Sequence, residues 1–231
     1  MIMEGIRKKF STELAYLLGI AMIALSAALM QRANFGMSMV VAPAYILHLK
    51  LSQIWKWYSF GVSEYLLQGV LLVALCIVMR RFKKGYIFSF VTAVFYGLLL
   101  DGFIALIAPL PLGGIAGRIV YYTAGLVICA VGVALVFHTY IAPEVYELFV
   151  KELSEKTGAA TSKVKTIYDC ASCVIGIILS FLFFGFGRFE GVNIGTVICA
   201  LVNGWMIGRF SKWLEKKFEF RDALPLRKYF E

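Results

Sequence analysis

VSEYLLQGVLLVALCIVMRRFKK, residues 62–84, is an apolar run of about one membrane thickness that ends in a cluster of basic residues. A transmembrane helix needs about 20 predominantly apolar residues. Basic residues collect at the cytoplasmic ends of such helices. The stretch therefore predicts a membrane-spanning helix over residues 62–80, followed by a cytoplasmic turn.

The composition of the whole chain indicates the same class of protein. Of its 231 residues, 61% are hydrophobic and 16% are charged, and the mean hydropathy is +0.81. Soluble domains are about 45–50% apolar and about 25% charged. The composition excludes a disordered chain, a coiled coil and a soluble enzyme, and it predicts an all-α fold, a polytopic membrane helical bundle. The six predicted transmembrane helices cover residues 13–31, 62–80, 86–108, 119–138, 166–187 and 193–211.

The net charge of +9 is distributed as in a membrane protein rather than as in a nucleic-acid-binding protein. With the N-terminus in the cytoplasm, the expected cytoplasmic segments carry 18 Lys and Arg residues, and the opposite segments carry five. This asymmetry predicts that both termini are cytoplasmic. We therefore expect the lipid bilayer as the surroundings of the chain, and no nucleic-acid partner.

Two connections between the spans are long enough to hold helices of their own. Residues 35–61 are mostly apolar with aromatic residues near the end, which indicates a short re-entrant or interfacial helix. Residues 143–157 predict an amphipathic helix with Pro143 and Glu144 in its first turn and Gly158 at its end. The pattern does not separate a re-entrant helix from one that lies on the membrane surface.

The two halves of the chain resemble each other, which indicates an internal duplication. The matched positions are Gly19 and Gly125, Ala42-Pro43 and Ala142-Pro143, Glu64 and Asp169, Gly97 and Gly204, and Phe103 and Phe210. Their separation drifts only from 100 to 107 residues. The first repeat covers about 13–108 and the second about 119–211, within a single membrane domain, 1–231, that ends in a cytoplasmic tail at 212–231.

Each repeat holds three spans, so the second repeat must lie upside down relative to the first. Inverted 3+3 repeats are a recurring construction of secondary transporters, whose halves exchange conformations around a site near the middle of the membrane. We therefore expect secondary transport of a small solute, with a cation as the favoured class. A duplicated membrane scaffold without transport is the alternative.

Charged side chains inside a membrane are costly and usually face a cavity or a partner. The candidate substrate-binding residues are Glu64, Asp169, Asp101, Asn34, His138, Glu144 and Asn203. Glu64 and Asp169 occupy matched positions, so a two-fold axis would bring them to opposite sides of one central cavity. Paired carboxylates suit a proton-coupled or cation-binding site. Both residues also fall near predicted helix N-termini, where the helix dipole alone favours a carboxylate.

The remaining candidates have structural alternatives. Asp101 has no basic residue within a helical turn, so its partner would come from another helix, and His138 could simply bind a backbone carbonyl. Arg32 could pair with one of the carboxylates. Cys170 and Cys173 have no histidine in their segment to complete a zinc site, and the sequence has no nucleotide-binding or hydrolase motif. We therefore expect no enzyme activity, no cofactor and no metal.

Three short motifs resemble those of the YczE/YyaS/YitT-type family of bacterial membrane proteins. Residues 32–38 (RANFGMS) are similar to the family's Arg-Ala-Asp-Leu-Gly motif, residues 191–197 (GVNIGTV) to its Gly-x-Gly-Thr segment, and residues 157–166 to its Thr-Gly-Leu-Ser linker. Asn34 replaces the usual aspartate, and Met39 stands where a proline is expected. The resemblance implies a multi-pass protein of the bacterial plasma (inner) membrane and assigns no substrate.

Two rivals to the transporter remain open. The chain could be the substrate-binding membrane subunit of a transporter whose ATPase is a separate protein, because the small residues Ala24, Ala27 and Ala28 suit docking to a transmembrane partner. It could also be an accessory or assembly protein that acts through helix contacts. A homodimer or a membrane partner protein is compatible with all three functions.

Overall fold

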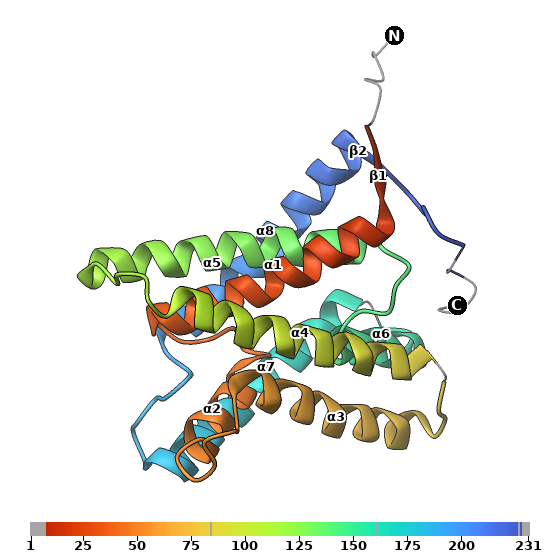
Figure 1. The fold of residues 1–231 in the computed structure, drawn as a ribbon. Helices are drawn as coiled ribbons and strands as arrows, with labels where there is room; N and C mark the ends of the chain where they lie inside the picture. The colour runs from red at the N-terminus through yellow and green to blue at the C-terminus, as the bar shows by residue number, and fades with distance from the viewer. Residues whose placement is uncertain (1–7, 84, 160, 226, 228–231) are drawn as a thin grey trace.

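The computed structural model describes residues 8–83, 85–159, 161–225 and 227, and these are almost entirely helical (Figure 1). In chain order the elements are β1 (Lys8–Ser11), α1 (Thr12–Ala33), α2 (Ala42–Leu51), α3 (Phe60–Met79), α4 (Gly85–Ile107), α5 (Gly114–Phe137), α6 (Val145–Thr157), α7 (Thr161–Phe184), α8 (Ile194–Lys217) and β2 (Phe218–Arg221). The prediction of an all-helical bundle is confirmed, with two short strands added.

Six of the helices, namely α1, α3, α4, α5, α7 and α8, are long and apolar enough to cross a membrane. α5 and α7 each begin five residues before the predicted start, at Gly114 and Thr161, and α8 continues to Lys217. The predicted tail at 212–231 therefore begins inside a helix. For α7 and α8 the reason is that hydropathy marks only the apolar part of a helix, whereas backbone hydrogen bonding continues through the polar residues beyond it. Most of the additional residues of α5 are not polar, but they include Gly114 and Gly117, and glycines of this kind favour a turn in a sequence-based prediction.

α1 packs along α5 and against α4, so it lies within the bundle (Figure 1). α5 packs in turn against α8, and α3 packs against α4. The two short helices lie between spans: α2 contacts α3 and α7, and α6 contacts α3, α4 and α7. α1 begins and α8 ends beside β1 and β2, and we name this end of the bundle the strand end and the opposite one the far end.

Glycines allow α1 and α5 to cross with their backbones in contact. A Cβ atom at Gly19 would lie 2.9 Å from the Gly132 carbonyl oxygen, and one at Gly132 would lie 2.9 Å from the Gly19 carbonyl oxygen. Further along the same pair, a Cβ atom at Gly125 would lie 3.0 Å from the Ser26 carbonyl oxygen. Small residues at such crossings let membrane helices gain van der Waals contact, because lipid supplies no hydrophobic force between helices.

α2 and α6 are the two short helices that the sequence predicts between the spans. α6 begins at Val145 and not at Pro143, because Glu144 has extended backbone angles (φ −56°, ψ 158°) and serves as the N-cap. Gly158 ends α6 in the left-handed conformation (φ 67°), as predicted. α2 occupies only ten residues of the predicted segment 35–61.

β1 and β2 form a two-stranded parallel sheet that joins the two ends of the chain. Phe10 pairs in register with Phe220, and its ring also contacts that of Phe218, with the centroids 5.3 Å apart. This sheet is not predicted from the sequence, because four-residue strands carry too short an alternation to be recognised. The sheet holds the start of α1 beside the end of α8.

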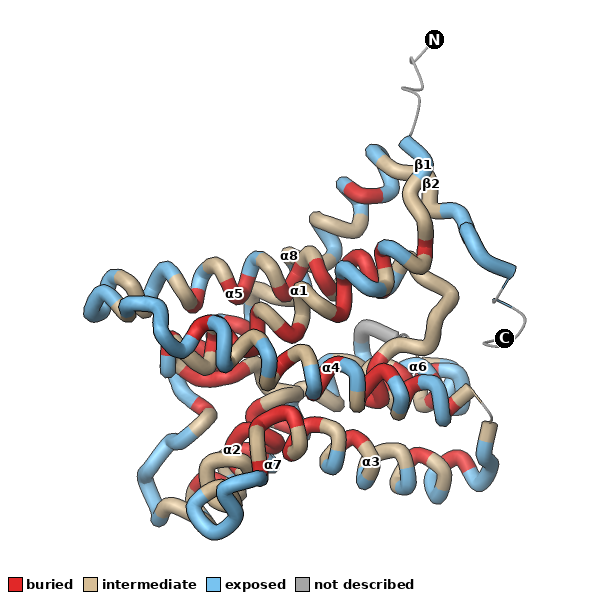
Figure 2. Tube along the Cα trace, viewed as in Figure 1, coloured by how far each residue is buried: buried red, intermediate tan, exposed pale blue. Residues whose placement is uncertain are grey.

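Burial decreases from α5 and α1 through α4 (33%) and α3 (28%) to α7 and α8 (Figure 2). In the apolar segments of α1 and α5, 44% and 56% of the residues are buried, whereas the value for α7 and for α8 is 17%. Large apolar side chains remain exposed on both, such as Leu182 on α7 and Leu201 on α8. The chain is therefore a membrane-embedded protein in which α1 and α5 form the core and the other spans present apolar faces outward.

Candidate functional site

Glu64 is a fully buried carboxylate on α3. Its Oε2 atom accepts a hydrogen bond from the Tyr146 hydroxyl of α6 at 2.9 Å. Its Oε1 atom has no hydrogen-bond donor in good geometry among the described residues. A buried carboxylate without a cationic partner is unfavourable unless it binds a proton or a cation. Glu64 is therefore suited to bind one of these.

Gln68, one helical turn after Glu64, connects α3 to the start of α6. Its Nε2 atom donates to Glu144 Oε2, and its Oε1 atom accepts from the Val145 amide, both at 3.1 Å. The side chains of Gln68 and Glu144 are buried. Two buried carboxylates, Glu64 and Glu144, therefore lie in the contact between α3 and α6.

Asp169 lies on α7, and its carboxylate forms an ion pair with Lys165, whereas Glu64 accepts a hydrogen bond from a hydroxyl group. Lys165, one turn earlier, places its Nζ atom 3.2 Å from Asp169 and 3.7 Å from Glu147 of α6. α6 thus contacts Glu64 through Tyr146, and it contacts Asp169 through the Glu147–Lys165 pair. The two matched carboxylates lie near one common element, the start of α6, and the cavity predicted between them stays a prediction.

The helix dipole does not account for Glu64 and Asp169. Neither α3 nor α7 has an acidic residue in its first turn. α7 begins at Thr161, so Asp169 is its ninth residue, and α3 begins at Phe60, so Glu64 is its fifth. Because the dipole effect falls off within the first turn, the interpretation of these residues as helix-capping carboxylates is wrong.

We call the contacting residues the polar core: Glu64, Gln68, Glu144, Tyr146, Glu147, Lys165 and Asp169. The polar core holds four acidic side chains and one basic side chain. Tyr96 of α4 is fully buried and lies within electrostatic range of Glu64 and Glu144. The excess of acidic groups favours protons or a positively charged solute over an anion. Within the described part of the chain, no group of three or more His, Cys, Asp or Glu side chains is placed to hold a metal ion.

Asp101 holds the beginning of α3 from the neighbouring helix α4. Its carboxylate accepts hydrogen bonds from the Ser59 hydroxyl and from the Gly61 amide, the latter at 2.8 Å. Ser59 is the N-cap of α3, and its hydroxyl also accepts from the Val62 amide. Asp101 therefore completes the N-terminal cap of α3 and clamps α3 to α4, and its partners come from another helix, as the sequence predicts.

His138 and Asn203 lie outside the polar core. The Nδ1 atom of His138 is 2.7 Å from the Ala134 carbonyl oxygen, and its Nε2 atom is 3.2 Å from Glu215 of α8. The prediction that His138 could bind a backbone carbonyl is thus confirmed for its Nδ1 atom. Asn203 of α8 points its amide nitrogen at the Cys129 sulfur, 4.0 Å away, and its Oδ1 atom is buried without a hydrogen-bond partner in the described chain.

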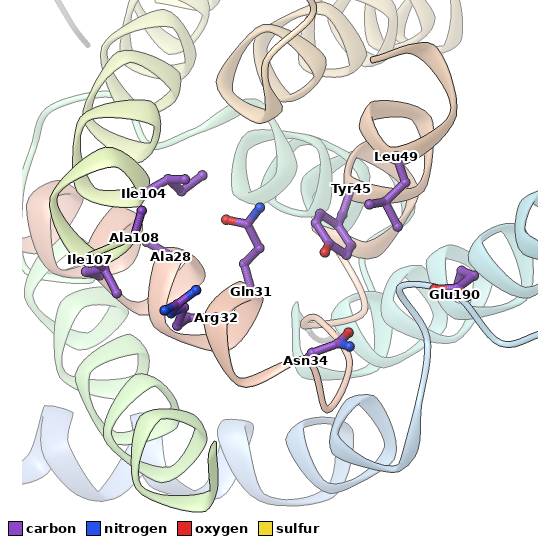
Figure 3. A pocket seen from close by; sticks show the side chains of 10 residues that line it. All are labelled: Ala28, Gln31, Arg32, Asn34, Tyr45, Leu49, Ile104, Ile107, Ala108 and Glu190. Atoms are coloured by element: carbon purple, nitrogen blue, oxygen red, sulfur yellow. The ribbon is translucent and has the colours of Figure 1, made fainter. Parts of the chain in front are cut away.

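A pocket of about 390 Å³ lies at the far end between α1, α2 and α4 (Figure 3). Its lining consists of Ala28, Gln31, Arg32, Asn34, Tyr45, Leu49, Ile104, Ile107, Ala108 and Glu190. Asn34 is the residue of this lining that the sequence analysis names as a candidate, and it ends α1 in the left-handed conformation (φ 54°). Arg32 donates from Nη2 to the Leu110 carbonyl at 2.8 Å, so the pairing with a carboxylate considered above is not observed.

Tyr45 and Glu190 line this pocket and are not identified by the sequence analysis. Burial raises the pKa of the Tyr45 hydroxyl above its ordinary value, and the Glu190 carboxylate raises it further. The hydroxyl therefore stays protonated and can donate a hydrogen bond. Tyr146 of the polar core is missed as well, because its partner Glu64 lies 82 residues away in the chain and no local motif marks the pair.

Comparisons with known proteins give a family and no activity. Residues 10–212, which include α1 to α7 and most of α8, match the family of unknown function DUF6198. Neither a curated protein nor a solved structure matches the chain. The function must therefore be argued from the fold and the site.

Proposed function

The chain belongs to the DUF6198 family of unknown function, and we propose that it is a secondary transporter of a small cationic solute. In this proposal the six spans and two short helices form an inverted 3+3 repeat, with α2 and α6 re-entrant from opposite faces of a bacterial plasma membrane. The 18-to-5 distribution of basic residues supports a cytoplasmic strand end. The resemblance of residues 32–38 to the YczE/YyaS/YitT-type family agrees with this location.

The crossing of α1 and α5 supports the inverted repeat. Gly19 and Gly125 are 106 residues apart in the chain, and so are Ser26 and Gly132. The contact of Gly19 with Gly132 and the contact of Gly125 with Ser26 are therefore one contact made in both directions. A two-fold axis through the crossing would produce this pairing.

The short helices support the repeat in the same way, because each lies on a span of the other half. Lys50 near the end of α2 donates to the Phe183 carbonyl near the end of α7. Lys156 near the end of α6 donates to the Val78 carbonyl near the end of α3. The two lysines are 106 residues apart and the two carbonyls are 105 residues apart. Each interaction is thus the counterpart of the other.

The position of α6 along α3 supports a re-entrant helix. Gln68, which accepts from the Val145 amide at the start of α6, is the ninth of the 20 residues of α3. Val78, which accepts from Lys156 at the other end of α6, is the nineteenth. α6 therefore follows α3 from its middle to its end, which is the course of a helix that enters half of the membrane and returns.

The observation that carries the proposal is a difference between two matched helix pairs. A Cβ atom at Gly97 of α4 would lie 2.7 Å from the Gly61 carbonyl oxygen of α3, so these helices are in backbone contact. The matched Gly204 of α8 has nothing within 4 Å, and α7 and α8 do not form a comparable packed pair. Inverted halves in different conformations support alternating access, because exchange of the conformations moves the opening to the other side of the membrane.

The polar core supports coupling of this conformational exchange to the binding of a proton or a cation. Glu64 lies on α3 and Asp169 on α7, the two helices whose contacts with their partners differ, and both carboxylates lie near α6. A proton or a cation bound at either carboxylate would favour one arrangement of α6 over the other, as a ligand with different affinities for two states does. The acidic excess of the polar core supports a cationic solute.

The test is uptake by the purified chain in proteoliposomes under an imposed proton gradient. The probes are radiolabelled methylammonium, choline and arginine, each of which is a cation at neutral pH. We expect uptake of at least one of them, and a loss of at least about tenfold in Glu64→Gln and in Asp169→Asn. The amides keep the size of the side chains, so both variants should fold.

Glu155→Gln is the matched control for these variants, because Glu155 is an exposed carboxylate on α6 outside the polar core. It should transport at the wild-type rate. Uptake of no probe by the folded protein would contradict the proposal, and so would wild-type uptake by the folded double variant Glu64→Gln/Asp169→Asn. Uptake that requires an ATPase purified from the same membranes would favour the subunit rival.

A second test addresses the exchange of conformations directly. Gly204→Leu has free space around it in this structure, but its side chain would obstruct a closed α7–α8 pair. We expect normal folding and at least about tenfold slower uptake. Gly102→Leu is the control, because a Cβ atom at Gly102 of α4 also has nothing within 4 Å and therefore lies outside the contact between α3 and α4. Equal uptake by the two variants would contradict the exchange.

A further inference from the structure

The hydroxyl-bearing residues of α4 form a row along the buried side of this helix. They are Tyr86, Ser89, Thr92 and Tyr96, and α4 has no others. They follow one another at intervals of three, three and four residues, so that one hydroxyl group lies in each successive turn. All four residues are buried, with at most 2% of each exposed. We call these four residues the hydroxyl row.

The hydroxyl row extends from the strand end to the level of Glu64. Tyr86 is the second residue of α4, and Tyr96 lies ten residues further along. At 1.5 Å per residue this distance is about 15 Å, half of a hydrocarbon core of about 30 Å. A Cβ atom at Gly97, next to Tyr96, would lie 3.1 Å from the Cδ1 atom of Tyr65, and Tyr65 follows Glu64 in α3. The row therefore ends beside the polar core.

The outer end of the hydroxyl row adjoins groups that are in contact with the solution. The Tyr86 hydroxyl lies beside the Glu152 carboxylate of α6. Glu152 in turn binds Arg81 and Lys83, whose side chains are 52% and 40% exposed. An open pocket of about 410 Å³, which Arg81 helps to line, lies at this end of α3. Water and protons from the solution at the strand end therefore reach the groups that surround Tyr86.

The inner part of the hydroxyl row holds polar atoms that the protein itself does not satisfy. The hydroxyl groups of Ser89 and Tyr96 and the Oε1 atom of Glu64 are buried, and none has a hydrogen-bond partner among the described residues. Tyr96 and Glu64 lie within electrostatic range of each other. Buried polar groups in proteins are nearly always satisfied by a protein group or by ordered water. Three such groups on two adjacent helices therefore indicate an interior that holds water.

The surroundings of Glu64 favour a proton over a metal cation. The ionisable groups near it are Tyr96 of α4, Glu144 and Tyr146 of α6, and Tyr168 of α7. α3 itself has no basic residue, and the basic residues of α2, His48 and Lys50, bond to backbone carbonyls. Among the described residues no group of acidic, histidine or cysteine side chains is placed to hold a metal ion. A proton neutralises a buried carboxylate without needing further ligands.

We propose that the hydroxyl row, with water between its members, carries protons between the solution at the strand end and Glu64. A hydroxyl group both accepts and donates. Each member therefore takes a proton from the side of the solution and passes its own proton inward, so it ends unchanged, and the Glu64 carboxylate becomes a carboxylic acid. Thr92 is held in place by the Tyr16 hydroxyl of α1 at 2.6 Å and by the Ala142 carbonyl at 3.1 Å.

This inference deepens the proposed function, because it names the ion that binds at Glu64 and the side from which it arrives. It rests on the proposed function only for the use that the protein makes of this proton. The route and the protonation of Glu64 rest on the buried groups alone.

The experiment follows the proton on Glu64 by infrared spectroscopy of the full chain in nanodiscs at neutral pH. A carboxylic acid has a carbonyl stretching band that an ionised carboxylate lacks, and the part of this band that disappears in Glu64→Gln belongs to Glu64. Replacement of H₂O by D₂O shifts this part at the rate at which the proton exchanges with the solution. We expect exchange to be at least about tenfold slower in Ser89→Ala and in Tyr96→Phe, because each variant removes one member of the row.

Two variants of α5 are the matched controls. Tyr121→Phe and Thr123→Val each remove a hydroxyl group that lies outside the row and bonds to backbone carbonyls. Both should exchange the Glu64 proton at the wild-type rate. The sign of the effect separates a lost route from a folding defect, because a loosened protein opens more often and would exchange the proton faster.

Each outcome decides the inference. An acid band that is the same in the wild type and in folded Glu64→Gln would overturn it, because Glu64 would then carry no proton. Exchange at the wild-type rate or faster in either Ser89→Ala or Tyr96→Phe would overturn the route. The measurement needs no solute and no flux, so slowed exchange in a protein that takes up no probe would contradict only the proposed function. Uptake of a probe by a protein whose row variants exchange normally would contradict only this inference.

Discussion

The helix pairs α3–α4 and α7–α8, which are counterparts in the proposed repeat, differ in how they pack. α3 and α4 meet at Gly61 and Gly97 with their backbones in contact. α7 and α8 diverge, and Gly204, the counterpart of Gly97, faces open space. Similar apolar sequences have therefore produced a closed pair in one half and an open pair in the other.

One chemical difference between the two pairs lies four residues after Gly97 and after Gly204. Asp101 of α4 clamps the first residues of α3 through Ser59 and the Gly61 amide. The residue that follows Gly204 by the same four positions is Gly208, which has no side chain to bond with α7. Closure of the first pair is thus supported by a hydrogen-bonded carboxylate, whereas closure of the second would depend on packing alone.

The largest effect should come from filling the glycine contact of the closed pair. Gly97→Leu should destabilise the protein by about 3 kcal/mol, because a side chain there meets the backbone of α3 and overpacks the contact. Gly204→Leu should change stability by less than about 0.5 kcal/mol, because nothing lies near it. Unfolding in detergent, followed by circular dichroism, measures both. Equal losses in the two variants would show that the pairs do not differ as described.

Removal of the clamp should have the next largest effect. Asp101→Ala should cost about 2 kcal/mol, because the Gly61 amide and the Ser59 hydroxyl lose a charged acceptor. The same unfolding assay measures the loss, with Glu155→Ala as an exposed control whose stability should stay within about 0.5 kcal/mol of the wild type. If Asp101→Ala matched this control, the clamp would not explain why α3 and α4 are closed.

The connection between α3 and α4 gives a smaller and pH-dependent effect. Glu152 of α6 binds Arg81 at 3.1 Å and also binds Lys83, and these two residues belong to that connection. Burial alone would raise the pKa of Glu152, but hydrogen bonds from Lys83, Tyr86 and Arg81 outweigh it and lower the pKa below the ordinary value of 4.5. Glu152→Gln should therefore lose about 1 kcal/mol at neutral pH, a modest value because both cations are about half exposed.

The pH dependence follows from the lowered pKa. A carboxylate with a lowered folded-state pKa contributes stability above its unfolded value of 4.5, and this contribution is lost as the pH falls through the folded value. The difference between wild type and Glu152→Gln should thus be full at about pH 7 and shrink steadily below about pH 4.5. Unfolding of both proteins across this range checks it, and a gap that widened toward low pH would contradict the assignment of the ion pair.

The smallest effects concern the two lysine-to-carbonyl contacts that the proposed repeat relates to each other, of which the Lys50 contact is partly buried and the Lys156 contact is exposed. Lys50→Met and Lys156→Met each remove one lysine-to-carbonyl hydrogen bond, so each should cost about 0.5–1 kcal/mol. The two losses should be similar, since each variant removes one lysine-to-carbonyl hydrogen bond near the end of a short helix. Thermal unfolding of both variants beside Lys163→Met, whose side chain is exposed, measures them. A loss in only one variant would limit the two-fold relation to the α1–α5 crossing.

The polar core illustrates how much of the site could be read from the sequence. Glu64, Glu144 and Asp169 are recognisable as candidates because ionisable groups in apolar segments are expensive. Tyr146, Glu147 and Lys165 are not, because α6 is an ordinary amphipathic segment in the sequence. Their importance arises from the contact between the start of α6 and α3, which joins residues about 80 positions apart.

The sequence by itself determined the class of the protein, its six long helices and the positions of its two short ones. These depend on hydropathy, on proline and on glycine, whose effects act within about one helical turn. It also carried the matched positions of the two halves, such as Gly19 and Gly125.

Only the tertiary structure decided that Asp101 clamps α3, that Asp169 pairs with Lys165 and Glu147, and that α7 and α8 stay apart. It also placed Arg32 and Glu190 on one pocket from segments about 160 residues apart. The physical reason is that lipid solvates every apolar face equally well, so hydropathy selects the spans without selecting their neighbours. The neighbours are selected by close backbone contact and by a few polar side chains, and these depend on geometry that one segment alone does not contain.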